Sequence, residues 1–317
     1  MGVFLWGCGA KRPEWVKTGR SNKHSPIMYF IGIGKSTDLS KAQDMARAEI
    51  AKIIKTEVLQ VSRDISQEIR SKSGYDILGE FERVTVSKTN EVLEGVKIEE
   101  TWKDESDNSY WVLAVLRRDE VEASLKDKIF EIDEKVSKWL EALQTASGVI
   151  EKMQIYKQII SLYRDRELYN AQLRVISPDG MAIGSDVDYI SLYNEFYKLK
   201  TNLKISIIQE GDFQDETREK IKEVLTQAGL SLYEGEDSDL VIKSKITLTP
   251  FERGDKYKHI LWELSLNVYE GEKVVLSEER RGEEGFLTED GAKQKSLHSI
   301  QSVISDSLLG LLKKITE

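Results

Sequence analysis

Ile27-Met28-Tyr29-Phe30-Ile31-Gly32-Ile33-Gly34-Lys35-Ser36 opens the segment that decides the fold, which extends to Arg70. The apolar run 27–31 predicts a strand, and the glycines that follow predict a turn. Ser40 and Gln43 fit a capping box, so we expect a helix to begin at residue 38 or 40. Apolar residues then recur at three- and four-residue steps: Ala42, Met45, Ala46, Ile50, Ile53, Ile54, Val58, Val61, Ile65 and Ile69. This spacing predicts one long amphipathic helix whose apolar face covers a sheet or a partner.

The composition is that of an ordinary globular protein. The residues are 40% hydrophobic and 32% charged, as in soluble globular proteins. The length of 317 residues favours about two domains. A net charge of −9 disfavours nucleic-acid binding, which normally requires a basic surface, so we expect no nucleic-acid partner. The single cysteine excludes an intramolecular disulfide, and the chain has no run of eighteen apolar residues that would predict a membrane span.

The lone cysteine, Cys8, ends the tetrapeptide Leu5-Trp6-Gly7-Cys8, which resembles the bacterial lipobox. We expect Cys8 to be lipidated and to anchor the chain in a membrane, with residues 1–7 as the remnant of a signal peptide. Residues 1–7 contain no Lys or Arg and are shorter than a complete signal peptide. The alternative is that Cys8 is an ordinary buried or surface thiol.

Residues 11–26 are basic, with Pro13 and Pro26 near their ends. Glu14 is the only acidic residue, against Lys11, Arg12, Lys17, Arg20 and Lys23. We expect residues 1–26 to form a signal remnant, lipobox and extended tether. The basic part of the tether either contacts anionic lipid headgroups or is a solvated linker.

Residues 27–118 are predicted to form one domain. The alternation over 96–102 and the apolar run 110–116 predict two strands joined by the polar turn 103–109. With the first strand and the long helix, this gives a β-α-β-β domain whose sheet is covered by that helix. Trp102, Tyr110 and Trp111 cluster at the hairpin, where they form either an interaction surface or side chains buried beneath the long helix.

Several of these segments resemble the Lpp-twenty family of bacterial envelope lipoproteins over residues 8–120. The resemblance is carried by Pro13-Glu14-Trp15-Val16, the strand 29–34, the helix positions Ala42, Ala46, Arg47, Ile50 and Ala51, and the strands 95–102 and 110–114. It implies a small β-α-β-β domain and a lipidated cysteine just before the Pro-x-Trp stretch, and therefore lipidation of Cys8. Some members are associated with the flagellar outer-membrane collar, so the resemblance implies a place at the periplasmic face of the outer membrane.

The middle of the chain changes to a heptad pattern. Two apolar seams flank Ser147-Gly148 and predict a helical hairpin over 119–176, followed by a loop and linker helix over 177–200. One continuous helix in an intermolecular coiled coil is the alternative. The seams are Leu125, Ile129, Ile132, Val136, Trp139 and Leu143, then Val149, Met153, Tyr156, Ile160 and Tyr163.

Residues 201–317 are predicted to form an α/β domain with a mostly antiparallel sheet. The order is strand 203–209, helix 215–228, strands 240–249, 260–269 and 274–280, and a final helix 289–314. This order resembles the domain of curli-secretion channel subunits, penicillin-binding-protein activators and the TolB amino-terminal module. The fold class of the whole chain is α+β.

Gly34-Lys35-Ser36 lies between a predicted strand and a predicted helix, where a phosphate-binding loop would stand. The full motif requires a glycine at the position of Tyr29, and the loop is too short to wrap a phosphate. The glycines are better explained by a turn and by close backbone packing. A cytosolic nucleotide-binding enzyme using Gly34-Lys35-Ser36 is the less favoured hypothesis.

Other patterns do not predict catalysis or metal binding. His24, His259 and His298 are scattered, and no carboxylate pair or Gly-x-Ser-x-Gly elbow marks a reaction centre. We therefore expect no catalytic residue, cofactor or metal site. The sequence favours a non-enzymatic, lipid-anchored envelope protein that acts as a structural, assembly or interaction module in the periplasm. Its partners would be the membrane through Cys8 and envelope proteins or further copies of itself. The alternative is a regulator of cell-wall synthesis or secretion by protein contact.

Overall fold

The computed structural model describes residues 11–316 except 75, 78–83, 85–87, 90–91 and 236. The fold is α+β, as predicted, and the chain divides into two compact units. One consists of Met1–Lys138 and Ile160–Asp188, and the other of Trp139–Ile159 and Tyr189–Glu317. Among the described residues, no helix combines the length and the apolar character that a membrane crossing requires.

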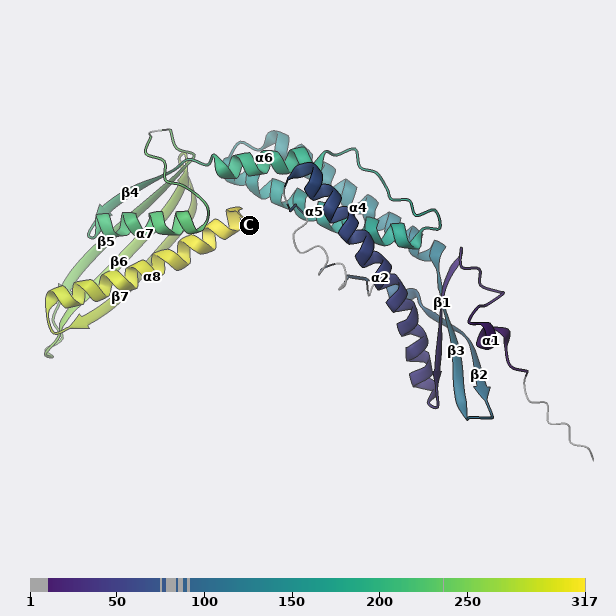
Figure 1. Cartoon of the computed structure of the whole chain (residues 1–317). Coiled ribbons are helices and arrows are strands. Elements are labelled where there is room, and N and C mark those ends of the chain that lie inside the picture. Colours follow the sequence, from purple (N-terminus) through teal and green to yellow (C-terminus); the bar gives the residue numbers. More distant parts are fainter. Residues whose placement is uncertain are drawn as a thin grey trace, which may run out of the picture. The chain divides into compact units, whose positions relative to one another are not determined.

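The first unit contains the predicted β-α-β-β arrangement. Its sheet has the order β1-β3-β2, and both strand pairs are antiparallel. The long helix α2 lies along one face of this sheet (Figure 1). A 3₁₀ turn, η1 (Leu93–Gly95), precedes the second strand. The elements are β1 (Tyr29–Ser36), α2 (Leu39–Ser73), β2 (Lys97–Asp104) and β3 (Ser109–Arg117).

Close packing of β1 on α2 depends on two glycines. Both lie inside β1, where Gly32 pairs with Ala114 and Gly34 with Val112, so the predicted glycine turn is wrong. A Cβ added at Gly34 would overlap the carbonyl oxygen of Ala42 in α2, and one added at Gly32 would overlap that of Ala46. The prediction that the glycines permit close backbone packing is therefore confirmed.

Helix α2 begins at a different cap from the one predicted. The side chain of Asp38 accepts a hydrogen bond from the amide of Lys41 at 2.9 Å, so Asp38 is the N-cap and Ser40 is already helical. The predicted apolar face is largely buried, although Met45 is 52% exposed. The buried positions are Ala42, Ala46, Ile50, Ile54, Val58, Ser62, Ile65 and Ile69.

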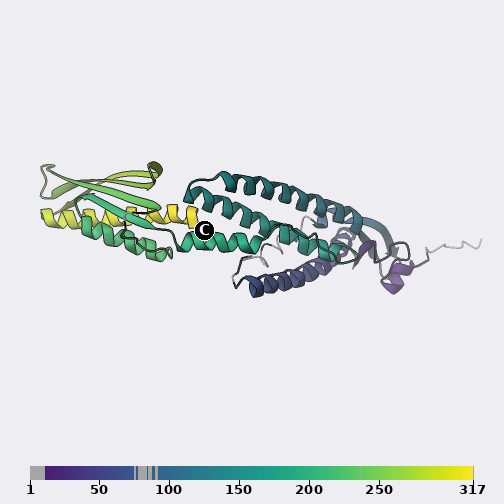
Figure 2. The same cartoon turned by 90° about the horizontal axis from the view of Figure 1, so that it is seen from above.

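The helical hairpin is confirmed. Helix α4 (Arg118–Thr145) ends and α5 (Val149–Ile176) begins on either side of the predicted break, so the continuous-helix alternative is wrong. The guanidinium of Arg118, at the start of α4, donates to the carbonyl oxygens of Val175 and Ile176 at the end of α5 (2.9 and 3.0 Å). The two helices are therefore antiparallel, and Figure 2 shows them side by side.

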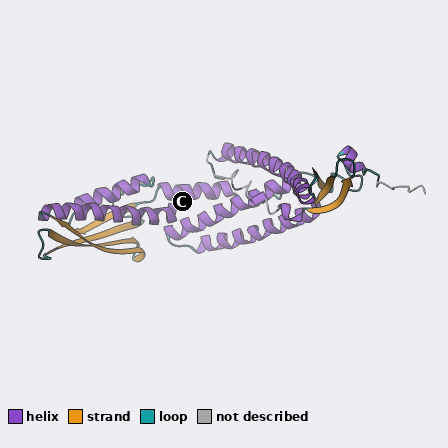
Figure 3. Cartoon of the chain, turned by 90° about the horizontal axis from the view of Figure 1, so that it is seen from below, coloured by secondary structure: helices purple, strands orange, loops and turns teal. Residues whose placement is uncertain are grey.

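The second unit contains a four-stranded sheet of order β4-β5-β6-β7. Strands β4 and β5 are parallel and the other pairs are antiparallel, so the mostly antiparallel sheet is confirmed. Helices α7 and α8 lie on the same face of this sheet (Figure 3). The elements are α6 (Tyr189–Thr201), β4 (Ile205–Gly211), α7 (Gln214–Gln227), β5 (Leu240–Phe251), β6 (Lys258–Glu270), β7 (Lys273–Phe286) and α8 (Glu289–Thr316).

Candidate functional site

The first candidate site is the face of the β1-β3-β2 sheet that points away from α2. Because side chains alternate along a strand, the residues next to Gly32 and Gly34 in β1 point to this second face. The register brings Lys35, Trp111 and Trp102 into one row across the three strands. The face is largely apolar and consists of Tyr29, Ile31, Ile33 and Lys35 of β1, Glu100 and Trp102 of β2, and Trp111, Leu113 and Val115 of β3.

A short helix, α1 (Glu14–Thr18), covers part of this second face. Its Trp15 and Val16 are buried against Leu113 and Val115. Residues 11–26 therefore do not form the extended tether that we predicted, because burying these two side chains holds the segment on the sheet. Full burial of side chains of this size is worth about 1.5–3 kcal/mol each.

Glu100 of β2 fixes this helix in place. Its Oε2 accepts a hydrogen bond from the indole N–H of Trp15 at 2.7 Å, and its Oε1 accepts one from Nζ of Lys23 at 2.8 Å. The hydrogen bond from Lys23 is the largest cause that lowers the pKa of Glu100, and the bond from Trp15 adds to it. The carboxylate is thus ionised at neutral pH and joins both ends of the α1 segment to the sheet.

Two cations lie over the ring of Trp111 at one end of the same face. Arg12 Cζ is 5.6 Å from the ring centroid, and Lys35 Nζ is 5.0 Å from it, within the range of cation–π attraction. Lys35 also pairs with Asp107 at 2.7 Å, and this hydrogen bond is the largest cause that lowers the pKa of Asp107 to about 2. Lys35 is therefore partly neutralised, whereas Arg12 has no ion pair within the described part of the chain.

The three aromatic residues predicted at the hairpin do not share one surface. Trp102 and Trp111 are directly paired on the second face, whereas Tyr110 lies on the α2 side, beside Lys103. The two tryptophans point away from α2, so the alternative that they are buried beneath the long helix is wrong. Their indole N–H groups are buried and have no hydrogen-bond partner within the described part of the chain. Cys8 lies outside the described residues.

Some residues of this face were not singled out in the sequence. Trp15 belongs to the quoted Pro-x-Trp stretch, and Glu100 stands two residues before Trp102, a spacing that places both on one face of a strand. Lys35 was considered only as part of a phosphate loop. The structure places Gly34-Lys35-Ser36 in β1, paired with Val112, Trp111 and Tyr110, so this segment is not a loop and the phosphate-loop interpretation is wrong.

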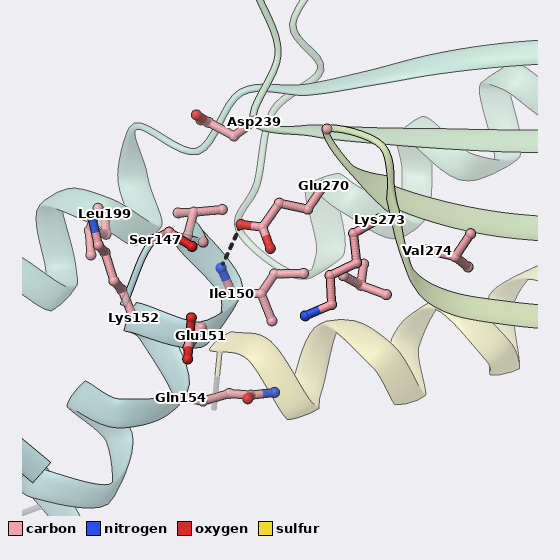
Figure 4. Close-up of a pocket in the computed structure, with 14 residues that line it drawn as sticks. Ser147, Ile150, Glu151, Lys152, Gln154, Leu199, Asp239, Glu270, Lys273 and Val274 are labelled. Carbon is pink, nitrogen blue, oxygen red and sulfur yellow. Dashed lines mark hydrogen bonds between the residues drawn. The ribbon is translucent and has the colours of Figure 1, made fainter. Parts of the chain in front are cut away.

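The second candidate site is a cleft of about 940 Å³ in the second unit. The carboxylate of Glu270, at the end of β6, accepts a hydrogen bond from the amide of Ile150 in the first turn of α5 at 3.2 Å (Figure 4). A Cβ at Gly148 would lie 2.6 Å from Glu270 Oε2, so any larger residue there would have to displace the end of the Glu270 side chain. Lys152, Lys273 and Asp239 line the rest of the cleft.

Glu270 of this cleft has a structural role. Glu270 satisfies an amide that the first turn of a helix leaves unpaired, and its negative charge matches the positive end of the helix dipole. Across the part of the chain that the structure describes, no group of three His, Cys, Asp or Glu side chains could hold a metal ion. The cleft thus joins the β6-β7 turn to the start of α5.

Comparison with known proteins gives remote likenesses only. No family model and no curated protein matches the chain, so membership of the Lpp-twenty family stays a prediction. The secreted protein HP1454 of Helicobacter pylori is similar with 15% identity and a TM-score of 0.38, over 89% of this chain and 98% of that one.

Two lipoproteins match shorter parts of the chain. A minor lipoprotein of Acinetobacter baumannii has 15% identity and a TM-score of 0.26, over 36% of this chain and 91% of that one. Lipoprotein GNA1162 of Neisseria meningitidis has 12% identity and a TM-score of 0.22, over 33% of this chain and 99% of that one. Similarity at this level does not define a common function.

Proposed function

We propose that this chain is a lipid-anchored, non-enzymatic protein of the bacterial envelope that is held at a membrane through Cys8 and binds other envelope components. The observation that carries the proposal is the short distance along the chain between Cys8 and the folded domain. Cys8 stands six residues before Glu14, where α1 begins, and Trp15 of α1 is already fixed to the sheet. The folded domain thus starts directly after the cysteine of the lipobox-like tetrapeptide.

The carboxylates of the two candidate sites have structural roles, which supports a non-enzymatic function. Glu100 holds α1, Glu270 caps α5 and Asp107 pairs with Lys35. Each of these carboxylates has a structural partner, and the pKa values of Glu100 and Asp107 are lowered, which favours the ionised form. A general acid at neutral pH would instead need a raised pKa.

The uncovered face of the second sheet supports a role in contact with a partner. Helices α7 and α8 cover one face (Figure 3). On the other face, exposed polar side chains of the described strands lie in register. Lys245 is paired through Ser265 with Glu279, and Thr247 through Glu263 with Arg281, so both signs of charge alternate across the strands. Such a surface fits a charged, complementary protein surface, supplied by an envelope protein or a second copy.

The experiment that tests the anchor is intact-mass spectrometry on the protein isolated from the membrane fraction of its native host. We expect a mature chain that begins at Cys8 and carries the mass of a diacyl or triacyl modification. The Cys8→Ser variant serves as the control and should lose both the added mass and the membrane fractionation. An unmodified chain that retains residues 1–7 in the soluble fraction would contradict the proposal.

A photo-crosslinking amino acid tests partner binding and the alternative role as a regulator of cell-wall synthesis or secretion. Placed at Thr247 on the uncovered face, it should give a defined product in intact cells, and at Lys222 on the exposed side of α7 it should not. A product of twice the chain mass identifies self-association, and a cell-wall synthase or secretion component identifies the regulator. Equal labelling from both positions would remove the uncovered face from the proposal.

A further inference from the structure

The segment that contains α1 exposes several basic side chains, although the chain as a whole is acidic. Lys11, Arg12, Lys17 and Arg20 are exposed there, and we call these four residues the basic face. Glu14 is the one acidic residue among them, and it accepts a hydrogen bond from Asn22 at 2.8 Å. The segment that follows Cys8 thus has a local excess of positive charge within a chain whose net charge is −9.

The basic face is held on a rigid support. Trp15 and Val16 are buried on the inner side of α1, and Glu100 binds Trp15 and Lys23. Arg12 lies 5.6 Å from the centroid of Trp111, which belongs to the central strand of the sheet. Because these contacts already order the segment, a ligand that binds the basic face does not have to order it.

Covalent geometry limits how far the basic face can be from Cys8. Four peptide units join Cys8 to Arg12, and a fully extended chain of that length spans at most about 14 Å. At physiological ionic strength, charges act over about 8 Å before screening dominates. With Cys8 anchored, Arg12 therefore stays within about 14 Å of the lipidated residue, and a chain that is less than fully extended can bring its charge within the screening length of the headgroups.

We propose that the basic face is a binding surface for anionic phospholipid headgroups, which sets the N-terminal domain on the bilayer with α1 toward the lipid. The inference rests on the proposed anchor for its role in the cell, but the binding itself belongs to the unlipidated chain. Arginine suits the contact because its guanidinium pairs with phosphate oxygens in a bidentate manner. The arrangement gives the protein a second membrane contact beside the single lipidated residue, which fits the general need for two signals in stable anchoring.

The test is sedimentation of the full chain with lipid vesicles, in a Cys8→Ser background so that no anchor contributes. Vesicles of phosphatidylcholine mixed with phosphatidylglycerol should bind the protein, and vesicles of phosphatidylcholine alone should bind it much less. Reversing three charges in Arg12→Glu, Lys17→Glu and Arg20→Glu should lower the partition coefficient on the order of 100-fold, at about fivefold or more for each charge.

A matched variant controls for the change in net charge. Lys135, Lys138 and Lys198 are exposed and lie outside the basic face, and their replacement by Glu alters the total charge equally. This variant should bind the anionic vesicles within about threefold of the parent, since the charges that it removes lie outside the basic face. Equal losses for the two triple variants would show a non-specific charge effect and would overturn the proposal.

A fluorescent probe tests which side of the domain meets the lipid. Cys8 is the only cysteine, so Thr18→Cys in the Cys8→Ser background gives one labelling site on α1, and Ser137→Cys gives a control site on α4. An environment-sensitive label at position 18 should shift to the blue with anionic vesicles, and the label at position 137 should not. The absence of a shift at position 18 would overturn the proposal. The proposal would also be overturned if the basic face crosslinked to a protein and the chain did not bind the anionic vesicles.

The two proposals fail in different ways. Vesicle binding without lipidation of Cys8 in cells would remove the anchor and leave the basic face as a lipid-binding surface. Lipidation of Cys8 with equal partition onto neutral and anionic vesicles would keep the anchor and overturn the headgroup contact.

Discussion

The indole N–H of Trp15 donates to Oε2 of Glu100 at 2.7 Å, across 85 positions of the sequence. This bond, together with the burial of Trp15 to 4% exposure, makes the segment after the lipobox-like tetrapeptide part of the folded domain. The segment that contains α1 is therefore packed on the sheet as part of the folded domain. The strength of this packing decides whether the basic residues of the segment keep their positions.

Replacement of Trp15 by Phe keeps most of the apolar contact but removes the hydrogen bond to Glu100. We expect a loss of about 1.5–3 kcal/mol of unfolding free energy, typical of a hydrogen bond to a charged group. Trypsin should cut faster after Lys17 and Arg20, because α1 leaves the sheet more often. Trp139→Phe, on an exposed part of α4, is the control and should leave the cleavage rate unchanged. Equal rates for Trp15→Phe and the parent would contradict this role of the bond.

Acid should loosen the same segment. The pKa of Glu100 is lowered in the folded protein, first by the hydrogen bond from Lys23, so its ionised form stabilises the fold above the pKa of the unfolded chain. This stabilisation is lost as the pH falls through the lowered, folded-state pKa. Tryptic release is not usable in acid, so exchange of the α1 amides with deuterium is the measurement. Exchange corrected for the intrinsic rate should rise below about pH 4 in the parent and depend less on pH in Glu100→Gln.

The contribution of Asp107 to stability should also depend on pH, in a lower pH range than that of Glu100. Its pKa falls from 3.8 to about 2, mainly because of the hydrogen bond from Lys35. The stabilisation is therefore complete above about pH 4 and is lost as the pH approaches 2. Urea unfolding at several pH values should show a shallower slope in this window for Asp107→Asn than for the parent. Asp104→Asn, in the same turn, is the comparison that separates this pair from a general charge effect.

The two glycines of β1 should be intolerant of any side chain. A Cβ at Gly34 would overlap the backbone of Ala42, which cannot move without shifting α2, so Gly34→Ala should cost about 3 kcal/mol or more. Gly310 in α8 has open space around it, and Gly310→Ala should instead stabilise the protein by about 0.5–1 kcal/mol. Thermal unfolding measures the stability of both variants. Similar changes in unfolding free energy for Gly34→Ala and Gly310→Ala would contradict the packing argument.

The contrast between these glycines shows what the sequence could and could not predict. Helix and strand periods depend on local spacing, so α2, the hairpin of α4 and α5, and the second sheet could be predicted from apolar patterns. The two glycines of β1 were assigned to a turn because glycine favours turns. The informative signal was their spacing of two, which matches small Ala42 and Ala46 at a spacing of four on the facing helix.

The second face of the β1-β3-β2 sheet was harder to predict because its composition depends on strand register. A bulge between Ile98 and Glu100 shifts the alternation of β2, so Ile98 pairs with Ala114 on the α2 side while Glu100 and Trp102 point to the other. Simple alternation over 96–102 places Ile98, Glu100 and Trp102 on one face of the sheet. The position of Trp15 on this face depends on a contact between distant segments, which periodicity does not describe.

The guanidinium of Arg166 should be the most sensitive single group of the helical hairpin. Its side chain is 1% exposed, and it donates to both carboxylate oxygens of Asp133 at 2.7 and 3.2 Å and to the carbonyl oxygens of Ile183 and Gly184 at 3.2 and 2.6 Å. It thus joins α4, α5 and the following loop. Arg166→Met leaves the two carbonyl groups without this donor and Asp133 without its partner, at a cost of about 3–5 kcal/mol.

A smaller loss is expected for Asp133→Asn, because Arg166 keeps its bonds to Ile183 and Gly184 and the new amide oxygen still accepts one hydrogen bond. Asp127→Asn, on the exposed side of α4, is the control and should change the unfolding free energy by less than about 0.5 kcal/mol. Chemical denaturation measures all three variants. If Arg166→Met were as stable as Asp127→Asn, the loop after α5 would be held by its other contacts, such as the bond from Asn170 Nδ2 to the carbonyl oxygen of Ile183 at 3.1 Å.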